Sequence, residues 1–253
     1  MLTVASSSNP GTARRVNEDS VMWESDISML AVADGMGGHN AGEVASKLAL
    51  ETVRSFLKKA RRDGFSWPFG VDPSLSAAAN RLMTSIKIAN RRVYRFSKAC
   101  LDYSGMGTTV VAAIAEGSRL SFCSVGDSRI YSFDGHELRQ LTKDDSWVAM
   151  LVKESALDAA AVDKHPMRHV LTSVVGVRPE LSVVVQEIDL VAGQTIMMCT
   201  DGLHGALSDA DIADVLRAET NLQRAAETLV ANAVRLDGKD NATIALARYV
   251  QMP

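Results

Sequence analysis

Apolar residues recur along this chain with two different periods. Over two long stretches, from about Gly42 to Arg62 and from Leu75 to Lys98, they repeat every three or four positions, which predicts two amphipathic helices. Elsewhere, short runs of small, β-branched and aromatic residues lie between glycines and Asp-Gly pairs, and this pattern predicts strands joined by turns. The predicted strands are 3–5, 21–23, 28–34, 109–115, 120–125, 130–133, 137–141, 181–188, 195–200 and 242–250.

The remaining segments complete this outline. A loop is predicted from Ser6 to Arg15, and a weakly amphipathic mixture of helix and loop from Ser146 to about His169. Ser208-Asp209-Ala210-Asp211 resembles a capping box that opens a helix through Leu216, and a last helix covers Leu222 to Ala233. Long helices in pairs, with strands grouped between them, favour antiparallel sheets covered by helices over a parallel βαβ arrangement. We therefore predict an α+β fold.

The composition is typical of one soluble globular domain spanning residues 1–253. The chain has 47% hydrophobic and 23% charged residues and a net charge of −3, so it lacks the basic excess that nucleic-acid binding requires. No apolar run approaches the roughly 18 residues of a membrane span, and Met1-Leu2-Thr3-Val4 has no basic region before an apolar core. Cys100, Cys123 and Cys199 form no CxxC pair and suit a reducing compartment. We expect a cytoplasmic monomer with no membrane contact.

Asp34 lies where an apolar run, Ala31-Val32-Ala33, meets Gly35-Met36-Gly37-Gly38. We expect a buried strand that ends at Asp34 in a glycine turn, where glycine allows positive φ and leaves no side chain in the way. In that arrangement the Asp34 carboxylate and the Gly35 carbonyl would face the same bound group.

Other acidic residues repeat this position at the end of a strand. Asp127 and Asp201 follow short apolar runs, Asp240 precedes the last predicted strand, and Asp19 stands beside Glu18 at an early strand. If these strand ends share one rim, the carboxylates converge, and like charges a few ångströms apart raise one another's pKa. Divalent cations relieve that repulsion, and oxygen ligands without nearby Cys or His favour Mg²⁺ or Mn²⁺ over Zn²⁺.

Six short motifs follow one another along the chain. They are Arg14-Arg15-Val16-Asn17-Glu18-Asp19, Asp34-Gly35-Met36-Gly37-Gly38, Gly105-Met106-Gly107-Thr108-Thr109, Gly126-Asp127-Ser128-Arg129, Thr200-Asp201-Gly202-Leu203 and Asp240-Asn241-Ala242-Thr243. In this order and spacing they resemble the motifs of the metal-dependent (type 2C, PPM family) Ser/Thr protein phosphatases, bacterial branch. The resemblance covers about residues 11–250. It implies a four-layer α-β-β-α sandwich, with two central antiparallel sheets flanked by helix pairs and a metal cleft at one sheet end.

The resemblance also implies an activity and a set of metal ligands. The activity is hydrolysis of phosphoserine and phosphothreonine in proteins by metal-activated water, with two core Mn²⁺ or Mg²⁺ ions and a possible third. Asp34 would bridge the two core ions, and the Gly35 carbonyl would bind the second. Asp201 and Asp240 would complete the first site.

Further roles follow from the same resemblance. Glu18 and Asp19 would hold metal-bound waters, and Asp127 with Asp201 would form the third, weaker site. Arg14 would bind the substrate phosphate, for which the bidentate fork of arginine is better suited than lysine. The partners would be phosphorylated proteins and a cognate bacterial Ser/Thr kinase.

The general acid is left open. His39 follows the glycines, and it either donates a proton or only caps the next helix. Met36 stands where eukaryotic relatives have a histidine. His136, in a predicted hairpin, and His204, after Gly202-Leu203, are expected to be structural.

Residues 142–176 resemble the flap of bacterial members of the family. Asp145 stands where the family usually has His, and Ser155 stands where a Gly is usual. Because flaps contact substrate and loops tolerate change, these two departures bear on substrate choice rather than on hydrolysis.

Two other functions are weighed against this one. Cys123 to Arg129 fits the C-x-x-G-x-x-R loop of cysteine-dependent phosphatases, but the next residues alternate like a strand, whereas that chemistry needs a thiolate at a helix N-terminus. The second alternative is an inactive relative that binds phosphoproteins as a scaffold. Such a protein would usually have lost a metal carboxylate, whereas Asp34, Asp201 and Asp240 are all present.

Overall fold

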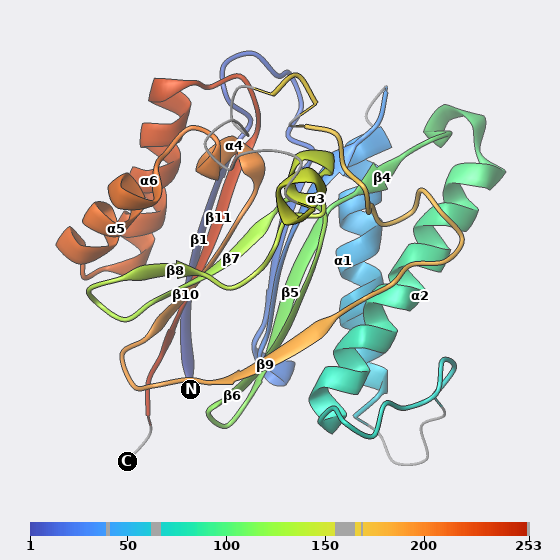
Figure 1. Cartoon of the computed structure of the whole chain (residues 1–253), viewed down its shortest axis with the longest axis horizontal. Helices are drawn as coiled ribbons and strands as arrows, with labels where there is room; N and C mark the ends of the chain where they lie inside the picture. Colours follow the sequence, from blue (N-terminus) through green and yellow to red (C-terminus); the bar gives the residue numbers. More distant parts are fainter. Residues whose placement is uncertain (39–40, 62–66, 155–164, 168, 252–253) are drawn as a thin grey trace.

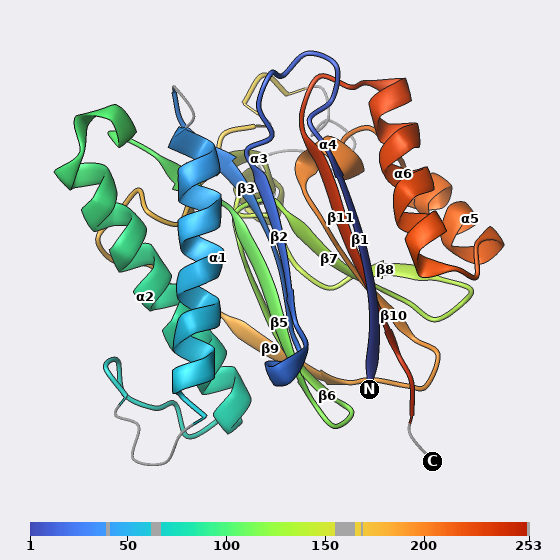
Figure 2. The same ribbon diagram turned by 180° about the vertical axis from the view of Figure 1, so that it is seen from behind.

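Two antiparallel sheets lie face to face, and helices cover the outer face of each (Figures 1 and 2). The computed structural model describes residues 1–38, 41–61, 67–154, 165–167 and 169–251. The first sheet has the order β1 (Leu2–Asn9), β11 (Ala242–Tyr249), β10 (Thr195–Cys199), β7 (Arg129–Phe133) and β8 (Leu138–Gln140). The second has the order β2 (Asp19–Glu24), β3 (Met29–Met36), β5 (Val110–Glu116), β6 (Arg119–Val125) and β9 (Val185–Asp189), with β4 (Gly107–Thr108) on the end of β3.

The helices form the two outer layers. Helices α1 (Ala41–Lys59) and α2 (Ala77–Ala99) cover the second sheet, and α5 (Asp209–Ala218) and α6 (Leu222–Leu236) cover the first. The short elements are α3 (Trp147–Lys153), α4 (Asp201–His204) and 3₁₀ turns at Ser25–Ile27 and Leu101–Tyr103. None of the helices in the described part of the chain has the length and apolarity needed to cross a bilayer.

Strand β3 shows why the central strands are apolar at nearly every position. Alternate residues of a strand point to opposite faces. Ala31 and Ala33 pack against the α1–α2 layer, whereas Leu30 and Val32 belong to the core between the two sheets. Both faces are covered, so the run reads as continuously hydrophobic. The predicted four-layer α-β-β-α sandwich is confirmed.

Strand β1 is longer than predicted. It continues through Ser6, Ser7 and Ser8 to Asn9, inside the predicted loop, and stays in register with β11. The Ser8 Oγ and Thr243 Oγ1 atoms lie 2.6 Å apart. As an edge strand β1 buries only Ala5, and backbone pairing with β11 maintains it without an apolar pattern.

The ends of other elements also differ from the prediction. Strand β9 begins at Val185 rather than at Leu181, and the short helix α4, which the sequence patterns did not predict, begins at Asp201. The capping box of α5 is confirmed, since Ser208 Oγ accepts from the Asp211 N–H at 3.2 Å and Asp211 Oδ2 accepts from the Ser208 N–H at 3.1 Å.

Candidate active site

One pocket collects most of the predicted site residues. It lies at the end of the sheets where β3 ends and α1 and α4 begin, the upper end in Figure 2. Its lining comes from the end of β3, from the first residue of α4 and from the segments that join β1 to β2, β3 to α1, β4 to β5, β6 to β7, α3 to β9 and α6 to β11. The lining residues are Arg14, Glu18, Asp34, Gly35, Met36, Gly37, Thr109, Asp127, His169, Leu171, Asp201, Asp240 and Asn241.

Asp19 and Asp34 face each other across β2 and β3. They are register partners of the two antiparallel strands, and like charges at directly opposed positions repel. Burial, followed by the charges of Asp19 and Asp201, raises the pKa of Asp34 well above its usual range. Burial is also the largest cause that raises the pKa of Asp19 to about 7, and the Thr200 hydroxyl opposes it by donating to Asp19 Oδ2 at 3.0 Å.

Asp127, in the turn that joins β6 to β7, and Asp201, at the start of α4, extend this cluster. Burial, and next the charge of Asp201, raises the pKa of Asp127 to about 7. The pocket therefore gathers carboxyl groups that oppose one another's ionisation, as the strand-end pattern predicted.

Two carboxylate oxygens in the described residues are buried without a hydrogen-bond partner. They are Oδ1 of Asp19 and Oδ1 of Asp201. A buried, unpaired oxygen is unfavourable, because it loses its water without regaining a donor. No three His, Cys, Asp or Glu side chains in the described ranges stand close enough to form a ready-made metal shell. The unpaired oxygens nevertheless fit a hard divalent cation, which would supply the missing partner and offset the repulsion.

Glycine at position 35 brings two segments together, but not as predicted. Strand β3 continues past Asp34, with Gly35 opposite Thr108 and Met36 opposite Gly107, so the predicted end of the strand at Asp34 is wrong and the chain leaves the strand only at Gly37, which has a φ of +153°. Gly35 has no positive φ. A Cβ on it would overlap the carbonyl oxygen of Gly42 in α1 and lie 2.7 Å from that of Glu18. Glycine is required here for close approach rather than for an unusual backbone conformation.

Arg14 lies at the mouth of the pocket. Its Nη2 atom is 3.0 Å from Asp240 Oδ2, and the two side chains are 51% and 42% exposed. An ion pair this exposed contributes little stability. Arg14 is therefore held near the carboxylates by a weak contact and is free to accept another anion.

Asn241 connects the loops that carry these groups. Its Oδ1 accepts from the Glu18 N–H at 2.8 Å, and its Nδ2 donates to the carbonyls of Pro10 at 2.9 Å and Val16 at 3.2 Å. The prediction quoted Asn241 within a motif but gave it no role. The signal that could have indicated this connection is an asparagine directly before an apolar strand, where its side chain can hydrogen-bond to neighbouring backbone.

Comparison with known proteins agrees with this geometry. The sequence matches the family described as Protein phosphatase 2C over residues 13–237. The chain belongs to the protein phosphatase 2C family.

Relatives and solved structures resemble the chain over nearly its whole length. It is 30% identical over 239 residues to the Serine/threonine phosphatase stp of Listeria monocytogenes, covering 93% of this chain and 91% of that protein. The Mycobacterium tuberculosis phosphatase PstP/Ppp superposes with a TM-score of 0.86 at 32% identity, covering 98% and 99% of the two chains. A catalytic domain of PstP in complex with 2 manganese ions gives a TM-score of 0.83 at 31% identity, covering 98% of each chain.

These comparisons confirm the predicted family and enzyme class. The protein is a serine/threonine protein phosphatase of the bacterial type, and its substrates are phosphoproteins. The manganese complex of PstP agrees with the predicted Mn²⁺ or Mg²⁺ cofactor.

The structure argues against Cys123 as a nucleophile in this phosphatase. The residue is buried inside β6, and burial raises the pKa of its thiol to about 12. The segment after it forms β7, so no helix N-terminus is present to stabilise a thiolate.

The histidines fall in different places. His39 lies outside the described residues, so its predicted role as acid or cap stays a prediction. His136 lies in the exposed β7–β8 hairpin. His204 is half-buried, and its Nε2 atom lies 3.0 Å from the Asp127 carbonyl oxygen. His169, which the sequence did not single out, lines the pocket.

Asp145 fastens the predicted flap to the β6–β7 turn. Its N–H donates to the Gly126 carbonyl at 2.8 Å, and its Oδ2 accepts from the Gly126 N–H at 3.2 Å. The Thr172 N–H donates to the Asp145 carbonyl at 2.7 Å, which joins the two ends of the segment that carries His169 and Leu171. Ser155, the second departure from the family, lies outside the described residues.

Proposed function

We propose that this pocket hydrolyses phosphoserine and phosphothreonine monoesters with two divalent ions held among its carboxylates. Asp34, Asp201 and Asp240 would hold the ions together with the Gly35 carbonyl. Glu18 and Asp19 would orient water, and Asp127 with Asp201 would hold a third ion. The observation that supports this most directly is that the pocket brings together Asp34 and Asp127, whose pKa values are raised, and Asp201, which has a buried oxygen without a hydrogen-bond partner.

The reaction explains why so many charges are needed. Hydrolysis of a phosphate monoester is among the slowest uncatalysed reactions, and enzymes accelerate it by up to ~10²¹-fold. A side-chain acid or base supplies only ~10²–10⁴-fold, so most of the acceleration has to come from electrostatics and positioning. When bound, paired divalent ions supply a nucleophile of lowered pKa and stabilise the charge on the phosphoryl oxygens.

The residues of this chain would do the binding and orienting. Arg14, at the mouth, would leave Asp240 and bind two phosphate oxygens through its guanidinium fork. Glu18 Oε1 accepts from the Gly42 N–H at 3.1 Å, which fixes its carboxylate at the start of α1 for contact with water. Asn241 would hold the Arg14–Glu18 loop in place.

The experiment is a metal-dependent phosphatase assay. We expect Mn²⁺-stimulated, EDTA-sensitive hydrolysis of p-nitrophenyl phosphate and of phosphothreonine peptides. Asp34→Asn and Asp201→Asn should each lower kcat by at least about 10²-fold, the scale of one preorganised electrostatic contact. His136→Ala, in the exposed hairpin, is the matched control. Near wild-type activity in either Asn variant would refute the proposal, and phosphopeptide binding without turnover in the wild type would favour the scaffold.

We also propose the finer parts of the assignment. Residues 1–253 would form one catalytic domain with a flap at about 142–176. The protein would be a cytoplasmic monomer without membrane contact, and it would remove the phosphates added by a bacterial Ser/Thr kinase. Capture of phosphoproteins by the inactive Asp201→Asn variant would identify the substrates. Loss of that capture after treatment with another phosphatase would show that the phosphate is recognised.

A further inference from the structure

His204 joins two parts of the pocket that are far apart in the sequence. It is the last residue of α4, the short helix that begins at Asp201. Its Nε2 atom lies 3.0 Å from the carbonyl oxygen of Asp127, in the turn between β6 and β7. A carbonyl oxygen only accepts, so Nε2 carries the hydrogen and donates.

This is the one side-chain hydrogen bond that the described residues donate to the Asp127 carbonyl. On the opposite side of the turn, the preceding residue Gly126 is held by Asp145 through two hydrogen bonds. The turn is therefore fastened to the predicted flap by Gly126 and to α4 by Asp127. If the bond from His204 were removed, the Asp127 side of the turn would lose its contact with the helix that carries Asp201.

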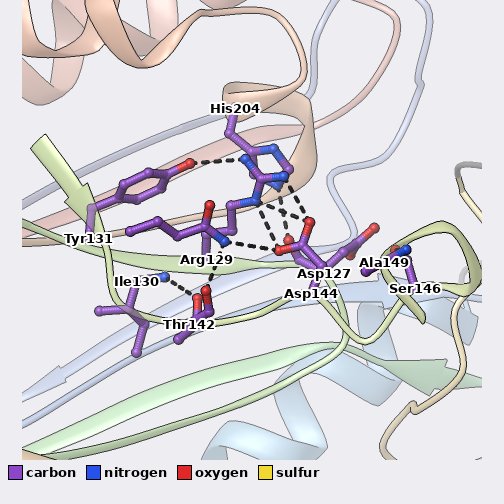
Figure 3. Close-up of polar contacts among 10 residues, drawn as sticks. Asp127, Arg129, Ile130, Tyr131, Thr142, Asp144, Ser146, Ala149 and His204 are labelled. Atoms are coloured by element: carbon purple, nitrogen blue, oxygen red, sulfur yellow. Dashed lines mark hydrogen bonds and ion pairs between the residues drawn. The ribbon is translucent and has the colours of Figure 1, made fainter. Parts of the chain in front are cut away.

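The surroundings of His204 keep its ring in place. Figure 3 shows the imidazole beside the guanidinium of Arg129. Arg129 is already occupied, because its Nε and Nη2 atoms donate to Asp144 at 3.0 and 2.8 Å and its Nη1 donates to the Tyr131 hydroxyl at 3.1 Å. The ring therefore packs against a neutralised ion pair, and its Nε2–H is directed at the Asp127 carbonyl.

Asp127 and Asp201 themselves lie close together in the pocket. The charge of Asp201 is the second cause, after burial, that raises the pKa of Asp127. A cation bound by both carboxylates needs them at a fixed separation, since a metal site tolerates only small errors in ligand position.

We propose that His204 is a positioning residue for this metal site: its hydrogen bond to the Asp127 carbonyl fixes the separation of Asp127 and Asp201. The inference rests on the proposed function, in which these two carboxylates share the third ion. Loss of a supporting contact of this kind lowers metal affinity by about 10–100-fold.

The test measures Mn²⁺ binding directly, by calorimetry and by the loss of the free-Mn²⁺ signal in electron paramagnetic resonance. His204→Leu removes the donor, and His204→Asn keeps a polar side chain that is too short to reach the carbonyl. His204→Gln places an amide N–H near the position of Nε2. We expect Leu and Asn to weaken the weakest Mn²⁺ site by about 10–100-fold and to leave the tighter sites unchanged, and Gln to restore much of the loss.

Two comparisons separate the possible failures. Asp127→Asn should abolish the same Mn²⁺ site, and adding His204→Leu to it should change nothing further. If Asp127→Asn removes no ion, the proposed third site is wrong. If Asp127→Asn removes an ion and neither His204→Leu nor His204→Asn affects it, the site stands and the role of His204 is refuted. Equal losses in Gln, Asn and Leu would also refute it, because packing rather than the hydrogen bond would then be responsible. His136→Ala is the control histidine.

Discussion

When divalent cations have been removed, the free energy of unfolding is expected to fall as the pH rises from about 4 to 7. Burial is the main cause that raises the pKa of Asp19 and Asp127 to about 7, from an ordinary value of 3.8. Between pH 3.8 and about 7 these two carboxyls hold protons in the folded chain that the unfolded chain has released. Stability then falls with rising pH, the reverse of ordinary acid denaturation.

The size of the effect follows from the shift. One pKa unit corresponds to about 1.4 kcal/mol, so a shift from 3.8 to about 7 destabilises the folded state above pH 7 by up to about 4 kcal/mol for each carboxyl. Asp19 and Asp127 share the neighbour Asp201, and side chains relax when charged, so we expect about 2–4 kcal/mol in total. This is a large part of the 5–15 kcal/mol that stabilises a typical domain.

Chemical denaturation in EDTA at several pH values between 4.5 and 8 measures the change. Saturating Mn²⁺ should remove the fall, because the cation keeps the carboxylates ionised and stabilises the folded state by about 2.7 kcal/mol at 100 times its Kd. Asp127→Asn removes one titrating group and should flatten the curve in EDTA. Stability in EDTA that stays level or rises between pH 5 and 7 would refute the reasoning, as would an unchanged slope in Asp127→Asn.

Three substitutions test other parts of the site. Gly35→Ala should destabilise the fold by about 1–3 kcal/mol, because the added Cβ would overlap the Gly42 carbonyl. Gly38→Ala is the control and should be neutral, because a Cβ at position 38 has no heavy atom within 4 Å. Thermal melting of the two variants measures the difference. Asn241→Ala removes three side-chain hydrogen bonds. It should lower the free energy of unfolding, measured with denaturant, by about 2–3 kcal/mol, and it should also lower kcat. Unchanged stability would contradict the connecting role of Asn241. Arg14→Lys should raise the KM for phosphopeptides about 10-fold, because lysine cannot make the bidentate contact with phosphate. The affinity for Mn²⁺ should stay unchanged. An unaltered KM would show that Arg14 does not bind phosphate.

Local patterns were sufficient where one neighbour decides the conformation. The helical spacing predicted α1 and α2 to within a few residues, and the Ser208–Asp211 capping box marked the start of α5. Both features depend on side chains three or four positions apart, which the sequence displays directly.

Patterns failed where a distant segment decides the conformation. Asp34-Gly35 reads as a turn, but β4 pairs with this end of β3 and prolongs it, and the glycine is required by the carbonyl of Gly42 in α1. The serines of β1 read as a loop, but pairing with β11 makes them a strand. No periodicity in the sequence specifies either partner.

The sequence by itself determined the carboxylates, their order and the chemistry that oxygen ligands favour, because residue type limits which ions can bind. Only the tertiary structure decided which of them meet. The pairing of β2 with β3 sets Asp19 opposite Asp34, and α4, following β10, brings Asp201 to Asp127 through the bond from His204. These separations depend on strand register and on contacts between segments more than seventy residues apart, and that information resides in the packed chain rather than in any local run of residues.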